Sequence, residues 1–173
     1  MTEKKTKIVL DADVLLHFAK GERLSLLPDI LKEYQFVVLD KVYDEVSSIH
    51  NQLDNQILFL KNITKISFSD VPREVVREYA RLATTFGRGE SACMAYCHYY
   101  NDVVGSSNTK DIKNYCTENG ITFLTTIDFL YLAYVRKLMT SDECKAFIET
   151  VRNKGSHGVP ETDITTYVFK KEI

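Results

Sequence analysis

Two aspartates, Asp11 and Asp13, flank a single alanine directly after a short apolar run, where an α/β sheet places its chemistry. The run, residues 7–10, is β-branched and apolar and too short for a helix, so it predicts a strand that feeds a helix beginning near Val14. The carboxyl end of a parallel strand borders the crevice where open α/β sheets bind ligands. The pattern therefore favours a functional role for Asp11, whereas Asp13 taken alone is more typical of a helix N-cap.

Three further polar residues occupy corresponding places along the chain. Glu45 lies on the helix expected after a second apolar strand, Glu90 begins the helix that follows a glycine-rich turn, and Asn108 follows a third apolar strand. Taken alone, each has a plain structural explanation, because acids suit the first turn of a helix and asparagine suits its N-cap. Their joint placement favours a functional site.

Three carboxylates and one amide gathered in one place suit Mg²⁺ or Mn²⁺. These ions prefer oxygen ligands and keep waters that a phosphate can replace. Two such ions about 3.5 to 4 Å apart activate the attacking water and stabilise the leaving oxygen of a phosphodiester. The implied chemistry is phosphodiester hydrolysis, which requires no nucleophilic side chain.

An alternation of short strands and helices would position these residues. Strands are expected at residues 7–10, 36–39, 103–105 and 121–124, with 63–68 as a minor strand or a loop. Helices are expected at residues 14–19, 24–31, 42–46, 57–60, 72–83, 90–100, 108–116, 127–139 and 140–151. The last of these helices opens with a capping box at Thr140 and Glu143. Residues 165–169 could add an edge strand or belong to a mobile C-terminal tail, residues 156–173.

The composition favours a single domain that covers residues 1–173. A chain of 173 residues, 45% of them hydrophobic, can bury about 70% of its unfolded surface. The net charge of −2 gives no overall basic surface for nucleic acid, so such a site must be local or bridged by metal ions. The chain has neither an apolar run of about 18 residues nor a signal-peptide pattern, so we expect a cytoplasmic protein that does not enter a membrane.

Thiol and zinc chemistry are not favoured. The four cysteines lack the paired spacing of a zinc site. Cys93, Cys97 and His98 could share a helical face, but their small apolar neighbours indicate a packed helix in which a free cysteine behaves as a hydrophobe.

Four segments, taken in order, resemble those that carry the acidic positions of PIN-domain nucleases. They are IVLDADVLLHFAKG with Asp11, LDKVYDEV with Glu45, GRGESACMAYC with Glu90 and VVGSSNTKDIK with Asn108. The resemblance spans about residues 7–156, and residues 120–151 are also similar to the subgroup related to toxins of bacterial toxin-antitoxin pairs. It implies a three-layer α/β/α sandwich around a mainly parallel sheet and Mg²⁺- or Mn²⁺-dependent cleavage of RNA. Frequent homodimerisation and a small antitoxin partner are further expectations from the resemblance.

The fourth segment departs from the family pattern. Such nucleases usually place an aspartate there, whereas this chain has Ser106, Ser107 and Asn108, and the nearest carboxylate is Asp111. An asparagine keeps a carbonyl oxygen but removes one negative charge, so metal affinity should fall. Three outcomes remain open: Asn108 serves as a neutral ligand, Asp111 substitutes for it, or the domain has lost catalysis and kept RNA or protein binding. Asp13 could restore part of the missing charge.

The resemblance assigns roles to individual residues. Asp11, Glu45, Glu90 and Asn108 are the predicted catalytic residues and metal ligands, with Asp111 as a further ligand. Ser106 would orient the adjacent ligand, and the candidates for holding RNA phosphates are Arg88, Lys110 and Lys113, each of which alone is better explained as a solvated charge. A phosphoacceptor receiver domain is disfavoured because the stretch after the third strand of the sheet offers Ser and Asn instead of a phosphorylatable Asp.

Overall fold

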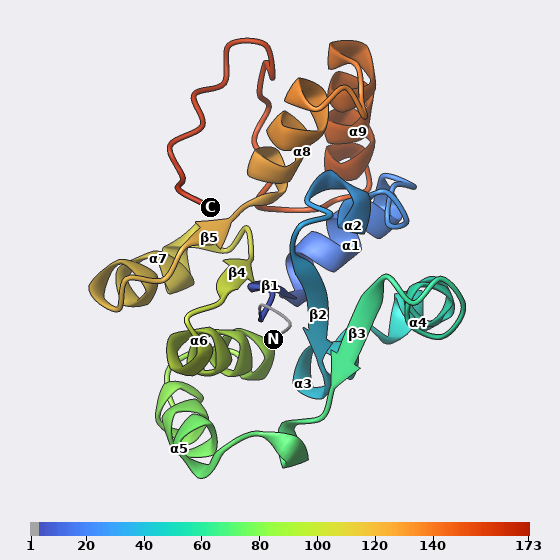
Figure 1. The fold of residues 1–173 in the computed structure, drawn as a ribbon. Coiled ribbons are helices and arrows are strands. Elements are labelled where there is room, and N and C mark those ends of the chain that lie inside the picture. The colour runs from blue at the N-terminus through green and yellow to red at the C-terminus, as the bar shows by residue number, and fades with distance from the viewer. Residues whose placement is uncertain (1–3) are drawn as a thin grey trace.

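The structure, a computed structural model, describes residues 4–173 and is built around a five-stranded sheet. The strands lie in the order β3-β2-β1-β4-β5, and every neighbouring pair is parallel. Their bounds are β1 (Lys7–Leu10), β2 (Gln35–Leu39), β3 (Ile63–Ile66), β4 (Val103–Gly105) and β5 (Phe123–Leu124). Because β1 is central and the sheet is parallel, the residues that follow β1 and β4 emerge side by side at one edge (Figure 1).

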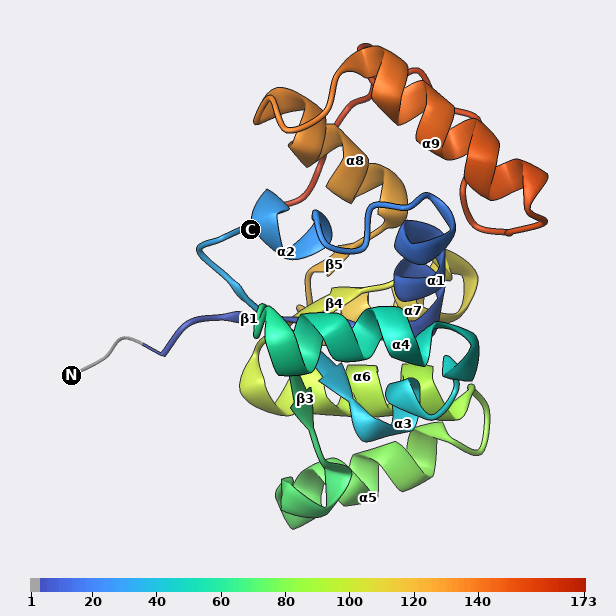
Figure 2. The ribbon, with the colours of Figure 1, turned by 90° about the vertical axis from the view of Figure 1, so that its right-hand side faces the viewer.

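Helices cover both faces of the sheet and give the three-layer α/β/α architecture. In Figures 1 and 2, α1, α2, α8 and α9 lie on one side of the sheet, and α5 and α6 lie on the other. The helices are α1 (Ala12–Lys20), α2 (Leu27–Ile30), α3 (Asp40–Tyr43), α4 (His50–Asp54), α5 (Arg73–Leu82), α6 (Arg88–Tyr100), α7 (Thr109–Glu118), α8 (Thr126–Val135) and α9 (Ser141–Asn153). A π-helical turn, Asn55–Phe59, continues α4.

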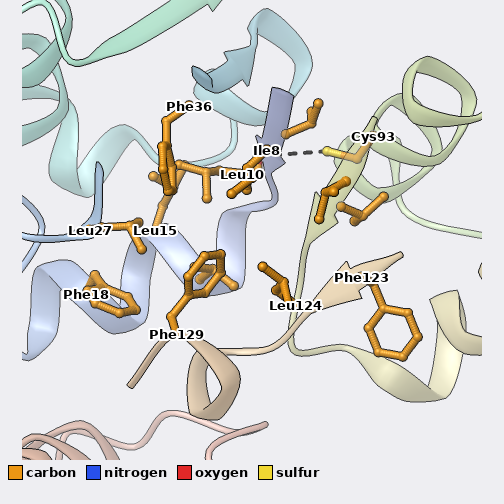
Figure 3. Packing of buried hydrophobic residues seen from close by; sticks show 14 of the residues in the cluster. Ile8, Leu10, Leu15, Phe18, Leu27, Phe36, Cys93, Phe123, Leu124 and Phe129 are labelled. Atoms are coloured by element: carbon orange, nitrogen blue, oxygen red, sulfur yellow. Dashed lines mark hydrogen bonds between the residues drawn. The ribbon is translucent and has the colours of Figure 1, made fainter. Parts of the chain in front are cut away.

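Aromatic side chains fill the layer between the sheet and the α1, α8 and α9 helices. Phe18 meets Phe129 edge to face with ring centroids 6.2 Å apart, and it packs against Phe147 at 5.1 Å. The ring centroids of Phe129 and of Phe36 on β2 are 6.3 Å apart. Figure 3 shows both rings among the buried residues around β1. On the other face, the buried thiol of Cys93 on α6 donates a weak hydrogen bond to the carbonyl of Leu10. The sheet that carries the candidate site is therefore packed tightly on both sides.

The main differences from the sequence-based expectations lie at helix ends. The helix expected at 24–31 is reduced to the single turn of α2, and Pro28 lies in its first turn, where its missing N–H costs nothing. The helix expected at 127–139 ends at Val135, because Lys137 takes a left-handed conformation with φ 60°. The capping box at Thr140 and Glu143 is confirmed at the start of α9.

The residues after α9 return across the molecule without forming a strand at 165–169. The hydroxyl of Tyr167 donates to Asp128 Oδ1 at 2.7 Å, and the Phe169 ring stacks on Tyr131 with centroids 5.6 Å apart. These contacts hold the segment against α8. In the part of the chain that the structure describes, no helix combines the length and the apolar character needed to cross a membrane.

Candidate functional site

Asp11 joins the end of β1 to the start of α1. It is the N-cap of α1, and its Oδ1 accepts a hydrogen bond from the Ala12 amide at 2.8 Å. Its Oδ2 accepts the Ser106 hydroxyl at 3.0 Å, and its own amide donates to the Gly105 carbonyl at 2.8 Å. Burial, followed by the charge of Asp13, holds the pKa of Asp11 well above its usual range. A buried carboxylate is thus fixed at the strand ends at an electrostatic cost.

Asp13 is not the N-cap of α1, because Asp11 already occupies that position. Its side chain instead reaches across to the residues after β4. Oδ1 accepts the Val14 amide at 2.7 Å, and Oδ2 accepts the Ser107 amide at 2.9 Å. Burial raises the pKa of Asp13 to about 6, and the Glu90 charge adds to the shift. Asp13 therefore brings a second, partly buried carboxylate to the same place.

We expect Asp13→Asn to stabilise the metal-free protein at pH 7. The folded-state pKa of about 6 exceeds the ordinary value of 3.8, so the ionised carboxylate opposes folding. The full shift corresponds to about 3 kcal/mol, and partial exposure together with the loss of one acceptor reduces the expected gain to about 1 kcal/mol. As the pH falls through 6 toward 4, the wild-type folded state binds the proton first and recovers this stability.

The measurement is thermal unfolding in a chelator at pH 7.5, 6 and 4, with the exposed α9 variant Asp142→Asn as control. The gain in unfolding temperature of Asp13→Asn over the wild type should shrink steadily toward pH 4, while the difference between the control and the wild type should not change with pH. An advantage that grows on acidification would contradict the assigned direction of the shift.

Glu45 lies in a turn beyond α3 and not on a helix as the sequence predicted. The helix ends at Tyr43, and Val46 leaves the helical conformation with φ −108° and ψ 39° while its side chain becomes fully buried. Glu45 Oε1 then accepts the amide of Gly89 at 2.9 Å, in the first turn of α6. A Cβ atom at position 89 would lie 2.6 Å from Glu45 Oε2 and 3.2 Å from Val42 Cγ2. The close approach of Glu45 to α6 therefore requires glycine at position 89.

Asn108 is the N-cap residue of α7 by position, yet its side chain does not cap the helix. Its Nδ2 donates to Glu90 Oε1 in a short hydrogen bond and to Asp111 Oδ2 at 2.8 Å. One amide group therefore links two carboxylates. Burial raises the pKa of Glu90, and the charge of Asp111 raises it further. Donation from the amide relieves part of this repulsion in the absence of a cation.

All five predicted ligands line one pocket of about 410 Å³ at the carboxyl ends of β1 and β4. Its lining residues are Asp11, Ala12, Asp13, Glu45, Gly87, Glu90, Asn108 and Asp111. Three larger hollows, of about 440, 500 and 600 Å³, include lysine or arginine among their lining residues. The pocket at the strand ends gathers five carboxylates and no basic residue in its lining. Its electrostatic character is therefore that of a cation site.

The donor set of this pocket fits Mg²⁺ or Mn²⁺, because carboxylate and amide oxygens are the ligands these ions prefer. Burial is the largest cause of the raised pKa values of Asp11, Asp13 and Glu90, and neighbouring carboxylate charges add to it, so a cation in the pocket would favour the ionised forms. Among residues 4–173, however, no three Asp, Glu, His or Cys side chains already stand close enough together to hold a metal ion. The carboxylates are engaged instead by amides and a hydroxyl, so cation binding would require these side chains to exchange partners.

The residues considered for substrate contact differ in position. Ser106 is fully buried and its hydroxyl donates to Asp11, which makes it an orienting contact for that carboxylate. Arg88 begins α6, while Lys110 and Lys113 lie on α7; all three are exposed, and none lines the pocket.

Sequence reasoning named Ser107 in the fourth segment without giving it a role, and it gave none to Thr126 or His17. Ser107 provides the amide that holds Asp13, and its hydroxyl bonds to Thr126, which in turn bonds to His17. The sequence held one signal for His17, which lies four residues after Asp13 and so on the same face of α1.

Comparison with known proteins supports the family assignment. A protein-family model described as a PIN domain matches residues 7–163 of the 173. A search of curated proteins gives no match. The matched range includes the whole parallel sheet, α1 through α9 and every residue that lines the pocket. The chain therefore belongs to the PIN domain family.

Proposed function

We propose that this PIN domain is a metal-dependent endoribonuclease that hydrolyses RNA phosphodiester bonds with Mg²⁺ or Mn²⁺. The observation that carries the proposal is that five carboxylates and Asn108 line one pocket, with no basic residue in its lining, at the carboxyl ends of β1 and β4. PIN domains are generally nucleases, which supports the same reading.

The ligands proposed for the cation are Asp11, Glu45 and Glu90, with Asn108 and Asp111 as further oxygen donors. A bound divalent cation would supply a Lewis acid and an activated water for attack on phosphorus. The chain supplies geometry and charge. Backbone amides hold Asp11, Asp13 and Glu45 at the ends of rigid elements, so their main chain is already in place, and cation binding requires only that their carboxylate oxygens exchange partners.

Cleavage of a single-stranded RNA by the purified protein tests the proposal. We expect endonucleolytic products with Mn²⁺ or Mg²⁺, none with a chelator, and no cleavage of a DNA strand of the same sequence. Activity that survives chelation would contradict a metal-dependent mechanism. Binding of RNA or a protein partner without any cleavage would favour the non-catalytic alternative.

The alternative, a binding module with weakened or lost catalysis, is favoured by one observation. Asn108 replaces a carboxylate and its amide occupies the space between Glu90 and Asp111. We expect Asn108→Asp to raise Mn²⁺ affinity about tenfold, because it adds one negative charge and removes the competing amide. The same change should lower the stability of the metal-free protein, since three carboxylates then face one another.

Calorimetric titration with Mn²⁺ measures this affinity, and Asp111→Asn serves as the matched variant with one charge fewer. An unchanged Mn²⁺ affinity in Asn108→Asp would exclude position 108 from the metal site.

Gly89→Ala tests the position of Glu45. The added Cβ must displace the flexible end of Glu45, so we expect about a tenfold loss of cleavage with a change in unfolding free energy of less than about 1 kcal/mol. Gly87→Ala is the control, because its Cβ would lie 3.6 Å from Glu90 Oε2, an ordinary contact. Equal activity in the two variants would remove Glu45 from the proposed machinery.

The toxin role extends the proposal on the resemblance of residues 120–151 alone. It requires that expression of the intact chain arrests growth and that a small antitoxin protein relieves the arrest. Arrest by the wild type and none by Glu90→Gln would tie the effect to the pocket.

A further inference from the structure

A chain of hydrogen bonds runs from the candidate site into the protein interior. It begins at Asp13 Oδ2, which accepts the Ser107 amide at 2.9 Å. The Ser107 hydroxyl donates to Thr126 Oγ1 at 2.9 Å and accepts the Thr126 amide at 2.9 Å. Thr126 Oγ1 meets His17 Nδ1 at 2.8 Å, and His17 Nε2 meets the carbonyl of His157 at 2.9 Å. Ser107, Thr126 and His17 are all buried.

The direction of every bond in this chain follows from its last member. The His157 carbonyl can only accept, so His17 Nε2 must carry a proton. Burial lowers the pKa of His17 to about 4, so the ring is neutral near pH 7 and Nδ1 is a bare acceptor. Thr126 must then donate its hydroxyl proton to Nδ1, which leaves Thr126 Oγ1 to accept from Ser107. The donor and the acceptor of each hydrogen bond along the path are thereby fixed.

Ser107 and Thr126 form a closed pair as a result. The Ser107 hydroxyl is engaged in both directions by Thr126, so the Ser107 main chain is held at the position where its amide faces Asp13. Gly158, with φ +79°, lies behind the same turn: a Cβ there would be 3.4 Å from both Cβ and O of Ser107. The turn that carries Asn108 is thus supported from the interior.

We propose that His17 is a positioning residue for the candidate site and acts through Thr126 and Ser107 on Asp13. The inference rests on the proposed function, because it assigns His17 a part in the same reaction. A buried histidine satisfied by its neighbours would be purely structural. Here the path ends on a carboxylate that lines the pocket, and the acceptor at Nδ1 sets the direction of the path.

Two substitutions at position 17 distinguish the contributions of the two imidazole nitrogens. The Oδ1 of an asparagine can take the place of His17 Nδ1, so His17→Asn keeps the acceptor for Thr126 and loses the bond to His157. The Nε2 of a glutamine can take the place of His17 Nε2, so His17→Gln keeps the bond to His157 and loses the acceptor for Thr126. Each variant removes one buried hydrogen bond, so their unfolding temperatures should be similar.

The experiment compares both variants and Thr126→Val with the wild-type protein. We expect His17→Gln and Thr126→Val to lower kcat for RNA cleavage about five- to tenfold with KM for RNA unchanged, and to weaken Mn²⁺ binding several-fold. For His17→Asn, the kcat, the KM for RNA and the Mn²⁺ affinity should each stay within about twofold of the wild-type values. The double variant His17→Gln, Thr126→Val should be no worse than either single change, because both break the same path.

A second readout needs no metal or substrate. The ¹⁵N chemical shifts of His17 at pH 7 should show a protonated Nε2 and an unprotonated Nδ1. A protonated Nδ1, or equal activity losses in His17→Asn and His17→Gln that follow their unfolding temperatures, would overturn the inference. A wild-type protein that shows no metal-dependent cleavage would overturn the proposed function instead. If that protein also binds no Mn²⁺, the positioning role is overturned with it.

Discussion

Asp11→Asn is expected to lower metal-dependent cleavage of RNA by at least about 100-fold while making the metal-free protein more stable. Asparagine keeps an oxygen that can accept the Ala12 amide, and the Ser106 hydroxyl can rotate to accept from the new amide group. The backbone bond to Gly105 is unaffected. What disappears is a buried negative charge that a cation would need and that the metal-free fold must tolerate.

The two effects have one cause. Burial and the neighbouring Asp13 charge raise the pKa of Asp11, so the ionised carboxylate opposes folding at neutral pH. Removing that charge should therefore stabilise the metal-free fold and weaken the proposed cation site. The control is Glu149→Gln, an equivalent carboxyl-to-amide change on the exposed face of α9. Cleavage rates and unfolding temperatures in a chelator are the measurements. An Asp11→Asn variant that cleaves RNA at the wild-type rate would exclude Asp11 from catalysis.

This combination of lower activity and higher stability separates a functional carboxylate from a structural one. If Asp11 were only a structural N-cap, Asp11→Asn would leave stability nearly unchanged, because asparagine caps a helix about as well as aspartate. Asp11 is an N-cap by position, but its burial beside Asp13 makes the charged form costly. No lysine or arginine is among the residues that line the pocket beside this charge, which supports the cation site proposed above.

The sequence allowed the sheet to be predicted because the relevant signals are local. The apolar runs at residues 7–10, 36–39 and 103–105 correspond closely to β1, β2 and β4, and parallel pairing then brings Asp11 and Ser106 to one edge. A short stretch of chain contains all the information that such a prediction needs.

Side-chain partners could not be predicted in the same way, because they join distant parts of the chain. Glu45 bonds to Gly89, 44 residues away, and Asp13 bonds to Ser107, 94 residues away. Local rules instead assigned Glu45 to a helix and Asp13 to an N-cap, since those are the commonest uses of an acid at such positions. The tertiary contacts override both assignments.

Gly21→Ala is expected to lower the free energy of unfolding by about 2 to 3 kcal/mol, one of the largest stability changes available from a single added methyl group in this fold. Gly21 follows the last turn of α1 with φ −79° and ψ 1°, a conformation that alanine adopts freely. The cost is therefore one of packing alone. A Cβ there would lie 2.2 Å from Cε2 and 2.4 Å from Cδ2 of Phe147 on α9.

The Phe147 ring has no free direction in which to move. It is 3% exposed and packs against Phe18, which in turn meets Phe129 edge to face. An added methyl group at position 21 must therefore separate α1 from α9 or displace three aromatic rings. Because α1 begins with the carboxylates of the site, we expect the same change to weaken Mn²⁺ binding. A protein of this size should lose roughly 5 to 10 °C in unfolding temperature.

A double-mutant cycle with Phe147→Leu tests the cause of this loss. The smaller side chain leaves room for the new methyl group, so the Gly21→Ala, Phe147→Leu protein should be more stable than the sum of the single changes predicts, by at least about 1 kcal/mol. Chemical denaturation of the four proteins gives the coupling energy directly. Strict additivity, or a Gly21→Ala protein that unfolds at the wild-type temperature, would show that α1 and α9 separate easily. The position of the carboxylates at the start of α1 would then depend on the bonds across the strand ends, those of Asp11 with Ser106 and Asp13 with Ser107, more than on the aromatic layer behind them.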